Sequence, residues 1–469
     1  MKKLLSCFYP LFICFIGTLF LSGCFYQVPS PLQKTPPLPP EQWVNSHLRQ
    51  PVSGIWLPLE NRDLLLKLIE EGLQNNSQLH VQAARVEAAL QNSIIAGADA
   101  SPEMSAFLRG GRQRSSQTTR DSFALGLDFS WELDLLGKLD DREQAALFDA
   151  AISIETWREK RLLLVAEISG QWFELLENYQ QLALIQKREH NLKNNLLIIE
   201  EGYEMGLSQS LDLHLARADF SAIGAKVIAR KREMRKQTRK MEYLLGRYPK
   251  SELLAAGMLP REMAAIPAGI PADILNRRPD ILAAGHTLAA ANLRVAEAYK
   301  NRFPSLRLTG SYGSSTDELN QLISAESVLW SLFAGLTTPL LYGGRLQAVQ
   351  GRSMARSRET AALYTDTVLS AFVEVEDSLE AEQRLAEQQT LVEQAAKDSV
   401  QANNLAFEQY QNGLVNYVTV LESERRAFDA QSTVLAIYNE RMQNRIRLFL
   451  ALGGDFSQTQ NEPPFPHLP

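Results

Sequence analysis

A duplicated pattern of helix-breaking glycines is the feature that most constrains the fold of this 469-residue chain. Three glycines recur 207 residues later, in the pairs Gly137 and Gly344, Gly206 and Gly413, and Gly246 and Gly453. Within each copy the spacings are 69 and 40 residues, so neither copy carries an insertion there. Upstream the offset is 202, with Pro102 matching Pro304. Because glycine and proline are the strongest helix breakers, the chain is predicted to contain two copies of one unit.

Between the first and second glycine of each copy lies a long stretch with few breakers. Residues 138–205 contain only Gly170 and Gly202, residues 345–412 contain only Gly351, and neither stretch contains proline. In the first stretch, apolar residues recur at spacings of three, four or seven: Leu164, Ile168, Leu175, Tyr179, Leu182, Ile185, Leu192, Leu196, Ile199 and Tyr203. This stripe is typical of a coiled coil. At ~1.5 Å per residue, each stretch predicts a helix of roughly 100 Å.

The second glycine of each copy is predicted to turn this long helix back on itself. Glycine adopts the left-handed conformation at little cost, so Gly206 and Gly413 are expected to end the long helices. Ser208 and Asn416 are candidate N-caps for the returning helices. About 35 further residues in each copy are predicted to be helical, as are residues 63–98. The simplest interpretation of each tip is an ordinary hairpin turn.

Two short segments in each copy are predicted to be strands instead. Residues 123–134 alternate without error, and one face carries Phe123, Leu125, Leu127, Phe129, Trp131 and Leu133. Residues 104–112, 305–313 and 328–340 are the other expected strands. The alternation fits a half-buried sheet in a soluble protein, or a membrane barrel whose apolar face contacts lipid. Single-chain barrels start at about eight strands, so a barrel built from this chain would need several copies.

The N-terminus is predicted to be a secretory signal. Lys2 and Lys3 precede an uncharged apolar run over residues 4–21. The run is just long enough to cross a membrane as a helix. However, residues 21–24 read LSGC, which resembles a bacterial lipobox, and this favours cleavage before Cys24. Cys24 would then carry a covalent lipid, a diacylglycerol and an N-acyl chain.

The sequence shows no pattern of a catalytic or metal site. Its six histidines have no metal-ligand spacing, and there is no Gly-x-Ser-x-Gly, phosphate-binding glycine loop or Cys-x-x-Cys. The net charge is −6, without a basic block, which argues against a nucleic acid partner. We therefore expect no enzyme activity, no catalytic residue, no metal and no cofactor apart from the lipid on Cys24.

Several motifs, placed on this duplicated frame, resemble the TolC/OprM family of outer-membrane efflux channels, in its lipoprotein or NodT-type branch. They are the lipobox at 21–24, WELDLLGKL at 131–139, NRRPDILAA at 276–284, FPSLRLTGSYG at 303–313, and the two Y-x-x-G-L tips at 203–207 and 410–414. Phe25, in the place where sorting signals for the inner membrane carry Asp, is similar to outer-membrane lipoproteins.

The resemblance implies a mainly α-helical protein with a membrane β-barrel. Three chains would form a homotrimer with a 12-strand barrel, four strands from each chain, and a tube of coiled-coil hairpins. It would lie in the outer membrane of a Gram-negative bacterium, anchored by lipid and extending into the periplasm. There it would be the passive exit duct of a tripartite efflux pump, with a periplasmic adaptor (membrane fusion) protein and an inner-membrane transporter of the RND type as partners.

The resemblance also assigns roles to residues. The strand residues from Phe123 to Leu133 would face lipid. Adaptor docking is expected at the tips: Gly206, Leu207, Ser208, Gly413, Leu414, Val415 and Asn416. The second tip of OprM-like channels often carries Asp after Gly-Leu, whereas this chain has Val415. Asp212 or Glu408 could supply the charge instead.

The expected organisation follows the chain in order. It is a signal peptide (1–23), a lipid-anchored proline-rich linker (24–45), first-repeat helices with part of an equatorial region (46–101), a first β-hairpin (102–136), a first long helical hairpin (137–246), an equatorial segment (247–278), a second-repeat helix (279–303), a second β-hairpin (304–343), a second long helical hairpin (344–453) and an equatorial tail (454–469). Two other functions stay open, a lipid-anchored structural coiled coil without a pore and a type I secretion duct.

Overall fold

The fold is taken from a computed structural model that describes residues 39–40, 43–44, 62–115, 118–255, 257–261 and 271–454. These residues belong to two compact units. One unit includes Ala100–Arg142 and Ala291–Ala361, and the other lies within Pro36–Asp99, Glu143–Ala290 and Ala362–Pro469. The signal peptide, Cys24, most of the linker and the tail beyond Gly454 lie outside the described residues.

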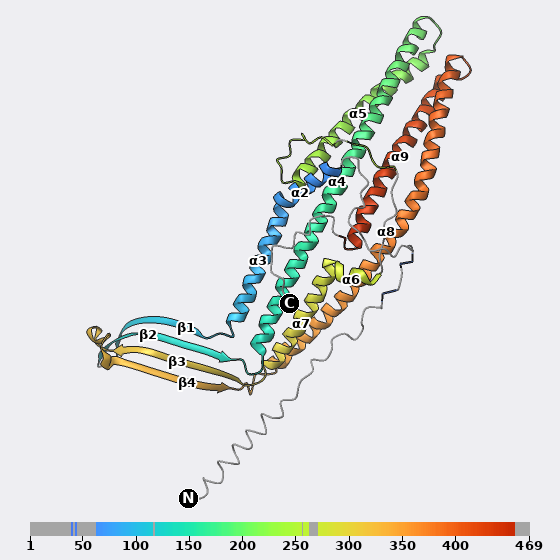
Figure 1. Ribbon diagram of the computed structural model, residues 1–469. Helices are drawn as coiled ribbons and strands as arrows, with labels where there is room; N and C mark the ends of the chain where they lie inside the picture. The colour runs from blue at the N-terminus through green and yellow to red at the C-terminus, as the bar shows by residue number, and fades with distance from the viewer. Residues whose placement is uncertain are drawn as a thin grey trace. The chain divides into compact units, whose positions relative to one another are not determined.

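The first unit contains an antiparallel four-stranded sheet. Its strands are β1 (Glu103–Arg114), β2 (Thr119–Leu133), β3 (Ser305–Thr316) and β4 (Val328–Thr337), in the order β1-β2-β3-β4 (Figure 1). The connection from β3 to β4 holds two short turns, η2 (Leu319–Gln321) and η3 (Ala325–Ser327). Since β2 of the first copy pairs with β3 of the second, the two repeats share one sheet.

The strand register gathers most of the apolar side chains on one face of this sheet. Phe129 lies opposite Met104 on β1 and Gly310 on β3, and Leu332 on β4 lies opposite Gly310. The six alternating residues of β2 therefore share a face with the apolar residues of its neighbours. The opposite face carries a polar row of Ser105, Asp128, Ser311 and Ser331.

All four predicted strands are present, but β1 extends to Arg114, β2 begins at Thr119 and β3 extends to Thr316, and two strands end earlier than predicted. β2 stops at Leu133, and the carboxylate of Asp134 instead accepts backbone N–H groups at 2.8–3.0 Å at the start of the next helix. β4 stops at Thr337 rather than at residue 340. Pro339 follows two residues later, and its missing N–H cannot extend a ladder.

The second unit contains the two predicted hairpins. In the first copy α4 (Lys138–Glu204) is followed by α5 (Ser210–Leu244), and in the second α8 (Arg345–Gln411) is followed by α9 (Tyr417–Ala451). Both long helices have 67 residues and both returning helices have 35, as the repeat predicted. The two turns lie at the same end of this unit (Figure 1). No described helix has an apolar stretch long enough to cross a membrane.

The predicted helical stretch over residues 63–98 is present, but it is divided into two helices. The structure has α2 (Arg62–Asn75) and α3 (Ser77–Ala98), with a break at Asn76. The Asn76 side chain accepts the N–H groups of Gln78 and Leu79 as the N-cap of α3. Its amide also donates to the carbonyl oxygen of Leu244, at 2.9 Å. A buried side chain with both a cap and a distant partner thus stabilises the break.

The second copy breaks its helix at the matching position. There η1 (Pro271–Asp273) and α6 (Ile274–Arg277) precede α7 (Pro279–Lys300), and Arg278 occupies the break. Arg278 Nη1 donates to the carbonyl oxygen of Ala451 at 3.1 Å. Because Arg278 matches Asn76 and Ala451 matches Leu244 in the repeat, the two copies make the same contact with different side chains.

The core of the helical unit is built mainly on the predicted stripe of α4. Seven of its ten residues are buried: Leu164, Ile168, Leu175, Leu182, Ile185, Leu192 and Ile199. Trp172 and Phe173 join Leu164, Ile168 and Leu175 in the largest cluster, together with residues of α2, α5 and α9. Tyr203, the last member of the stripe, is 45% exposed because it lies at the turn.

Candidate functional site: the hairpin tips

Each hairpin ends in the same hydrogen-bonded turn. Gly206 has a φ of 74°, its N–H donates to the carbonyl of Tyr203, and the N–H of Leu207 donates to the carbonyl of Gly202. At the second tip Gly413 has a φ of 71°. This pair of bonds around a left-handed residue is the Schellman motif.

The second tip repeats these bonds one for one. The N–H of Gly413 donates to Tyr410, and that of Leu414 donates to Gln409, both at 2.9 Å. A Cβ added to either tip glycine would meet no atom within 4 Å. Glycine is therefore required by the left-handed backbone and not by crowding, which confirms the prediction for both tips.

The two predicted N-caps differ in outcome. Asn416 caps α9, because its side-chain oxygen accepts the N–H of Thr419 at 3.0 Å. The prediction for Ser208 is wrong, since α5 is preceded by Gln209, whose side chain makes no cap bond. Ser208 instead lies near the hydroxyl of Tyr410 on the second hairpin, where it acts to lower the pKa of that hydroxyl.

The most exposed apolar side chains at the tips are two equivalent leucines. Leu207 is 79% exposed and Leu414 is 73% exposed. In a Schellman motif this residue often packs on the residue whose carbonyl it bonds. Here those residues are Gly202 and Gln409, which offer no apolar side chain, so both leucines project into solvent.

A small core joins the two hairpins beneath the tips. It consists of Ile199, Leu213, Ala216, Tyr417 and Val420, from α4, α5 and α9. Tyr417 is 1% exposed, and its ring centroid lies 5.6 Å from that of Tyr410 on α8. Burial raises the pKa of the Tyr417 hydroxyl, and the nearby Glu424 raises it further, so Tyr417 is neutral.

The acidic side chain beside the tips is Asp212. It adds to the effect of burial in raising the pKa of both Tyr410 and Tyr417. Glu408, the other predicted candidate, is exposed, and Val415 is half-buried. The structure therefore places Asp212, on the first hairpin, against the tyrosines of the second.

A groove with a cavity volume of about 660 Å³ runs along the second hairpin next to its tip. Its lining residues come from α8, the turn and α9: Asp398, Ser399, Ala402, Asn416, Val418, Thr419, Glu422, Ser423 and Arg426. Hydrogen bonds from Arg425 and Arg426 lower the pKa of Glu422 to about 2. The groove therefore stays charged over the physiological range.

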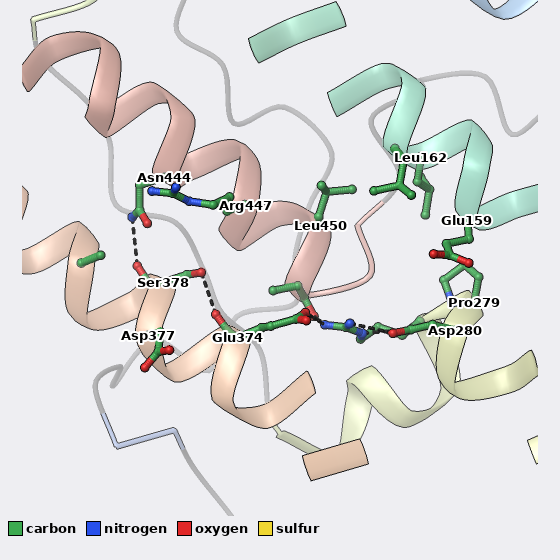
Figure 2. Close-up of a pocket in the computed structure, with 14 residues that line it drawn as sticks. Glu159, Leu162, Pro279, Asp280, Glu374, Asp377, Ser378, Asn444, Arg447 and Leu450 are labelled. Carbon is green, nitrogen blue, oxygen red and sulfur yellow. Dashed lines mark hydrogen bonds and ion pairs between the residues drawn. The ribbon is translucent and has the colours of Figure 1, made fainter. Parts of the chain in front are cut away.

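A second cavity, also of about 660 Å³, lies between the start of α7, the end of α9 and the neighbouring parts of α4 and α8. Two arginines, Arg278 and Arg447, line it. Arg278 pairs with Asp280 and Glu374, both at 2.7 Å, and Figure 2 labels these two acids. The same side chain holds the end of α9 through Ala451. Because four of its five N–H donors are bonded to Asp280, Glu374 and Ala451, Arg278 holds these helices together. Among the described residues, no group of three or more His, Cys, Asp or Glu side chains is placed to hold a metal ion.

The comparison with known families decides the family of the chain. Residues 68–247 and 270–454 match the outer membrane efflux protein family, one segment for each repeat. The chain belongs to the outer membrane efflux protein family. It is accordingly an outer-membrane protein that serves as the channel component of an efflux pump.

Individual relatives agree with this family. The cation efflux system protein CusC of Escherichia coli O6:H1 is 30% identical over 398 residues, which cover 83% of this chain and 86% of CusC. The probable outer membrane lipoprotein SilC of Salmonella typhimurium is 29% identical over 453 residues, or 94% of this chain and 97% of SilC. A crystal structure of CusC has a TM-score of 0.82 at 27% identity and covers 90% and 99% of the two chains.

The structure brings together some predicted residues of this efflux protein and adds others. The tip residues lie at one end of the helical unit, and the six strand residues lie on one face of the sheet. Their expected roles in docking and lipid contact stay predictions. Sequence reasoning missed Tyr410, Tyr417 and Glu424, which lie beneath the tips. The spacing of Tyr417, Val420 and Glu424 along one helix face was the available signal.

Proposed function

We propose that three copies of this chain assemble into the exit duct of a tripartite efflux pump. Each chain contributes four strands to a closed 12-strand barrel in the outer membrane and two helical hairpins to a tube. Cys24 carries the lipid that helps to anchor the assembly. The hairpin tips dock a periplasmic adaptor protein, which links the duct to an inner-membrane transporter of the RND type.

The observation that carries this proposal is the sheet with two open edges. Most apolar residues of the four strands share one face, on which Trp330 (75% exposed) and Leu332 (64%) lie uncovered. Phe107, Leu329 and Phe333 lie on the other face. Within the described residues, β1 and β4 each pair on one side only. Open edges invite pairing with another chain, and a strand in lipid must have all its backbone groups paired. Closure with neighbouring copies satisfies both requirements.

Docking at the tips is supported by their chemistry. Leu207 and Leu414 are exposed apolar side chains at equivalent positions, and a polar groove lies next to the second one. A rim of polar groups around exposed apolar anchors is typical of a protein interface. The resemblance to TolC/OprM channels supports an adaptor protein as the partner of this surface.

Planar-bilayer conductance of the purified mature protein, with its mass in detergent, tests the duct. We expect discrete channels and a mass of three chains. A monomer without conductance would overturn the proposal in favour of a structural coiled coil without a pore. Conductance by a dimer or tetramer would overturn the 12-strand barrel alone.

Docking is tested separately by Gly413→Pro. Proline fixes φ near −65°, so the left-handed turn cannot form. We expect export and adaptor cross-linking to be lost while the mass and conductance persist. Asn412→Pro is not a suitable control, because it would break α8 as well. Leu414→Asn keeps the turn and removes only the apolar contact, and it should weaken adaptor binding in the same direction.

A further inference from the structure

The interface between α4 and α9 is a ladder of polar rungs. Gln443 donates to the carbonyl of Gly170 at 2.9 Å. Nearer the tips, Asn439 donates to Glu177 at 2.7 Å.

A third rung lies closer still to the tips. Gln181 donates to the carbonyl of Ser432, and the Ser432 hydroxyl donates back to Gln181, both at 2.9 Å. In each of the three rungs the two residue numbers add up to between 613 and 616. The sum is nearly constant because the two helices run antiparallel.

The next position of this ladder toward the tips holds an acid and a base that do not pair. The numbers of Arg188 on α4 and Glu424 on α9 add up to 612, so the register places them at one level. Glu424 is 6% exposed, and neither of its carboxyl oxygens has a hydrogen-bond partner among the described residues. The Nε of Arg188 is also buried without a partner, and its guanidinium lies 4.8 Å from the ring centroid of Phe428.

The groups around Glu424 favour its neutral form. Burial raises the pKa of Glu424 to about 7, Arg188 opposes this shift, and Asp219 on α5 adds to it. On α9 itself, the buried hydroxyl of Tyr417 has no partner among the described residues either. From α8, Tyr410 acts on Tyr417. An ionised carboxylate buried without a partner is strongly unfavourable, so it must either take up a proton or find a cation.

The first hairpin has a residue of opposite charge at the position that matches Glu424. The residue that matches Glu424 in the repeat is Arg217, which pairs on the surface with Glu200 at 2.9 Å. In the second copy, Glu200 is replaced by Phe407, a half-buried member of the small core beneath the tips. Glu424 therefore has no ion-pair partner within its own hairpin, and Arg188 is the cation that acts on it most directly.

We propose that Arg188 and Glu424 form a fourth rung of this ladder in a second conformation of the tip region, and that proton release from Glu424 drives the chain into it. In the conformation described here Glu424 is protonated and Arg188 stacks on Phe428. When the proton leaves to solvent, the carboxylate draws Arg188 off the ring and the end of α9 shifts against α4. Because α9 begins at the second tip, the shift moves that tip. In the proposed duct, a movement of this tip would open the inner end of the tube. That role of the switch rests on the proposed duct function.

Distance measurement between spin labels tests this device. Labels on Lys187→Cys and Thr433→Cys, two exposed positions on α4 and α9, report on the interface in the full mature protein. A carboxyl with a pKa near 7 is about nine-tenths protonated at pH 6 and about one-tenth at pH 8. We expect two distance distributions that exchange with a midpoint near pH 7.

Three variants make the result specific. Glu424→Gln is expected to hold the pH 6 distribution at both pH values. The exchanged pair Arg188→Glu with Glu424→Arg keeps one acid and one base at this level, so it is expected to form the rung and give the pH 8 distribution at pH 8. Glu440→Gln, an exposed acid on the same helix, should shift as the parent does. An unchanged distribution in the parent protein, or an unchanged shift in Glu424→Gln, would overturn the inference. The measurement needs no conductance, so a failure of the duct proposal would be seen independently.

Discussion

The repeat glycines share one backbone conformation but differ in their surroundings. Gly206 and Gly413 turn in open space, whereas a Cβ on Gly246 would lie 2.5 Å from the carbonyl oxygen of Asn75. Gly453, which matches Gly246, would bring a Cβ within 3.0 Å of the backbone of Arg277. The tip glycines are thus replaceable at the cost of strain alone, while the other pair also allows close packing at the helix breaks.

The first prediction at this scale compares these two environments. Gly413→Ala is expected to lower the free energy of unfolding by about 1–2 kcal/mol, the cost of a left-handed residue with a Cβ. Gly246→Ala should cost clearly more, because backbone atoms would have to move as well. Thermal unfolding followed by circular dichroism measures both. Equal losses would show that the contact with Asn75 relaxes freely.

A second prediction concerns Glu242, which is 3% exposed at the end of α5. Its carboxylate accepts the backbone N–H groups of Ser251 and Glu252, both at 2.7 Å, and of Leu253 at 3.2 Å. Burial works to raise the pKa of Glu242, but these three donors outweigh it and lower the pKa. The stabilisation is therefore complete above about pH 4.3, the usual glutamate value, and is lost as the pH falls through the lower pKa of the folded state.

Glu242→Gln tests this account. It removes the charge that the three N–H groups share, and we expect a loss of about 1.5–3 kcal/mol near pH 7. Below pH 4 the difference between the variant and the parent should shrink. A pH-independent difference would mean that shape rather than charge holds the segment after α5.

At the scale of the elements, the helix breaks show how one fold uses two different side chains. Asn76 and Arg278 occupy matching breaks, and each donates to the last turn of a returning helix. Only Asn76 also caps the helix that follows it, since Arg278 is followed by Pro279. Proline at the first position of α7 needs no N–H partner there, so a cap is less important.

The third prediction separates the two contacts of Asn76. Asn76→Ser keeps an N-cap oxygen but cannot reach Leu244, and Asn76→Ala loses both contacts. We expect the alanine variant to lose about 1–2 kcal/mol and the serine variant to lose part of that. Chemical unfolding of the two variants side by side is the measurement. If serine were as damaging as alanine, the bond to Leu244 would be the dominant contact.

At the scale of the whole molecule, membrane attachment can come from two sources. The apolar face of the sheet is one, and the predicted lipid on Cys24 is the other. Further along the chain, Trp43 is buried against α8 and α9, and the N–H of Val44 donates to Glu376 at 2.8 Å. The start of the described chain is thus held to the helical unit without help from a lipid.

The fourth prediction follows from these two sources. Mass spectrometry of the mature N-terminal peptide should show a diacylglycerol and an N-acyl chain on Cys24. Cys24→Ser, made behind a signal that is cleaved without lipidation, should lose this mass. The variant should still fractionate with the outer membrane, because the apolar sheet face remains. Release of the variant into the soluble fraction would show that the lipid is the dominant anchor.

The sequence by itself determined the elements and their duplication. The glycine spacing located both turns, the long stretches without proline and with few glycines defined α4 and α8, and strict alternation defined β2. These signals are local, because backbone conformation and side-chain period depend on residues close in sequence. The family followed from the same motifs.

Only the tertiary structure decided which distant residues meet. The break at Asn76 depends on Leu244, 168 residues away. The pKa of Glu424 depends on its burial and on Arg188 and Asp219, which belong to the other hairpin. The spacing with Tyr417 and Val420 indicates the face of α9 on which Glu424 lies, but the raised pKa of Glu424 comes from the helices packed against that face. The sequence therefore specified the two hairpins, and only their packing specified the contacts and the buried groups between them.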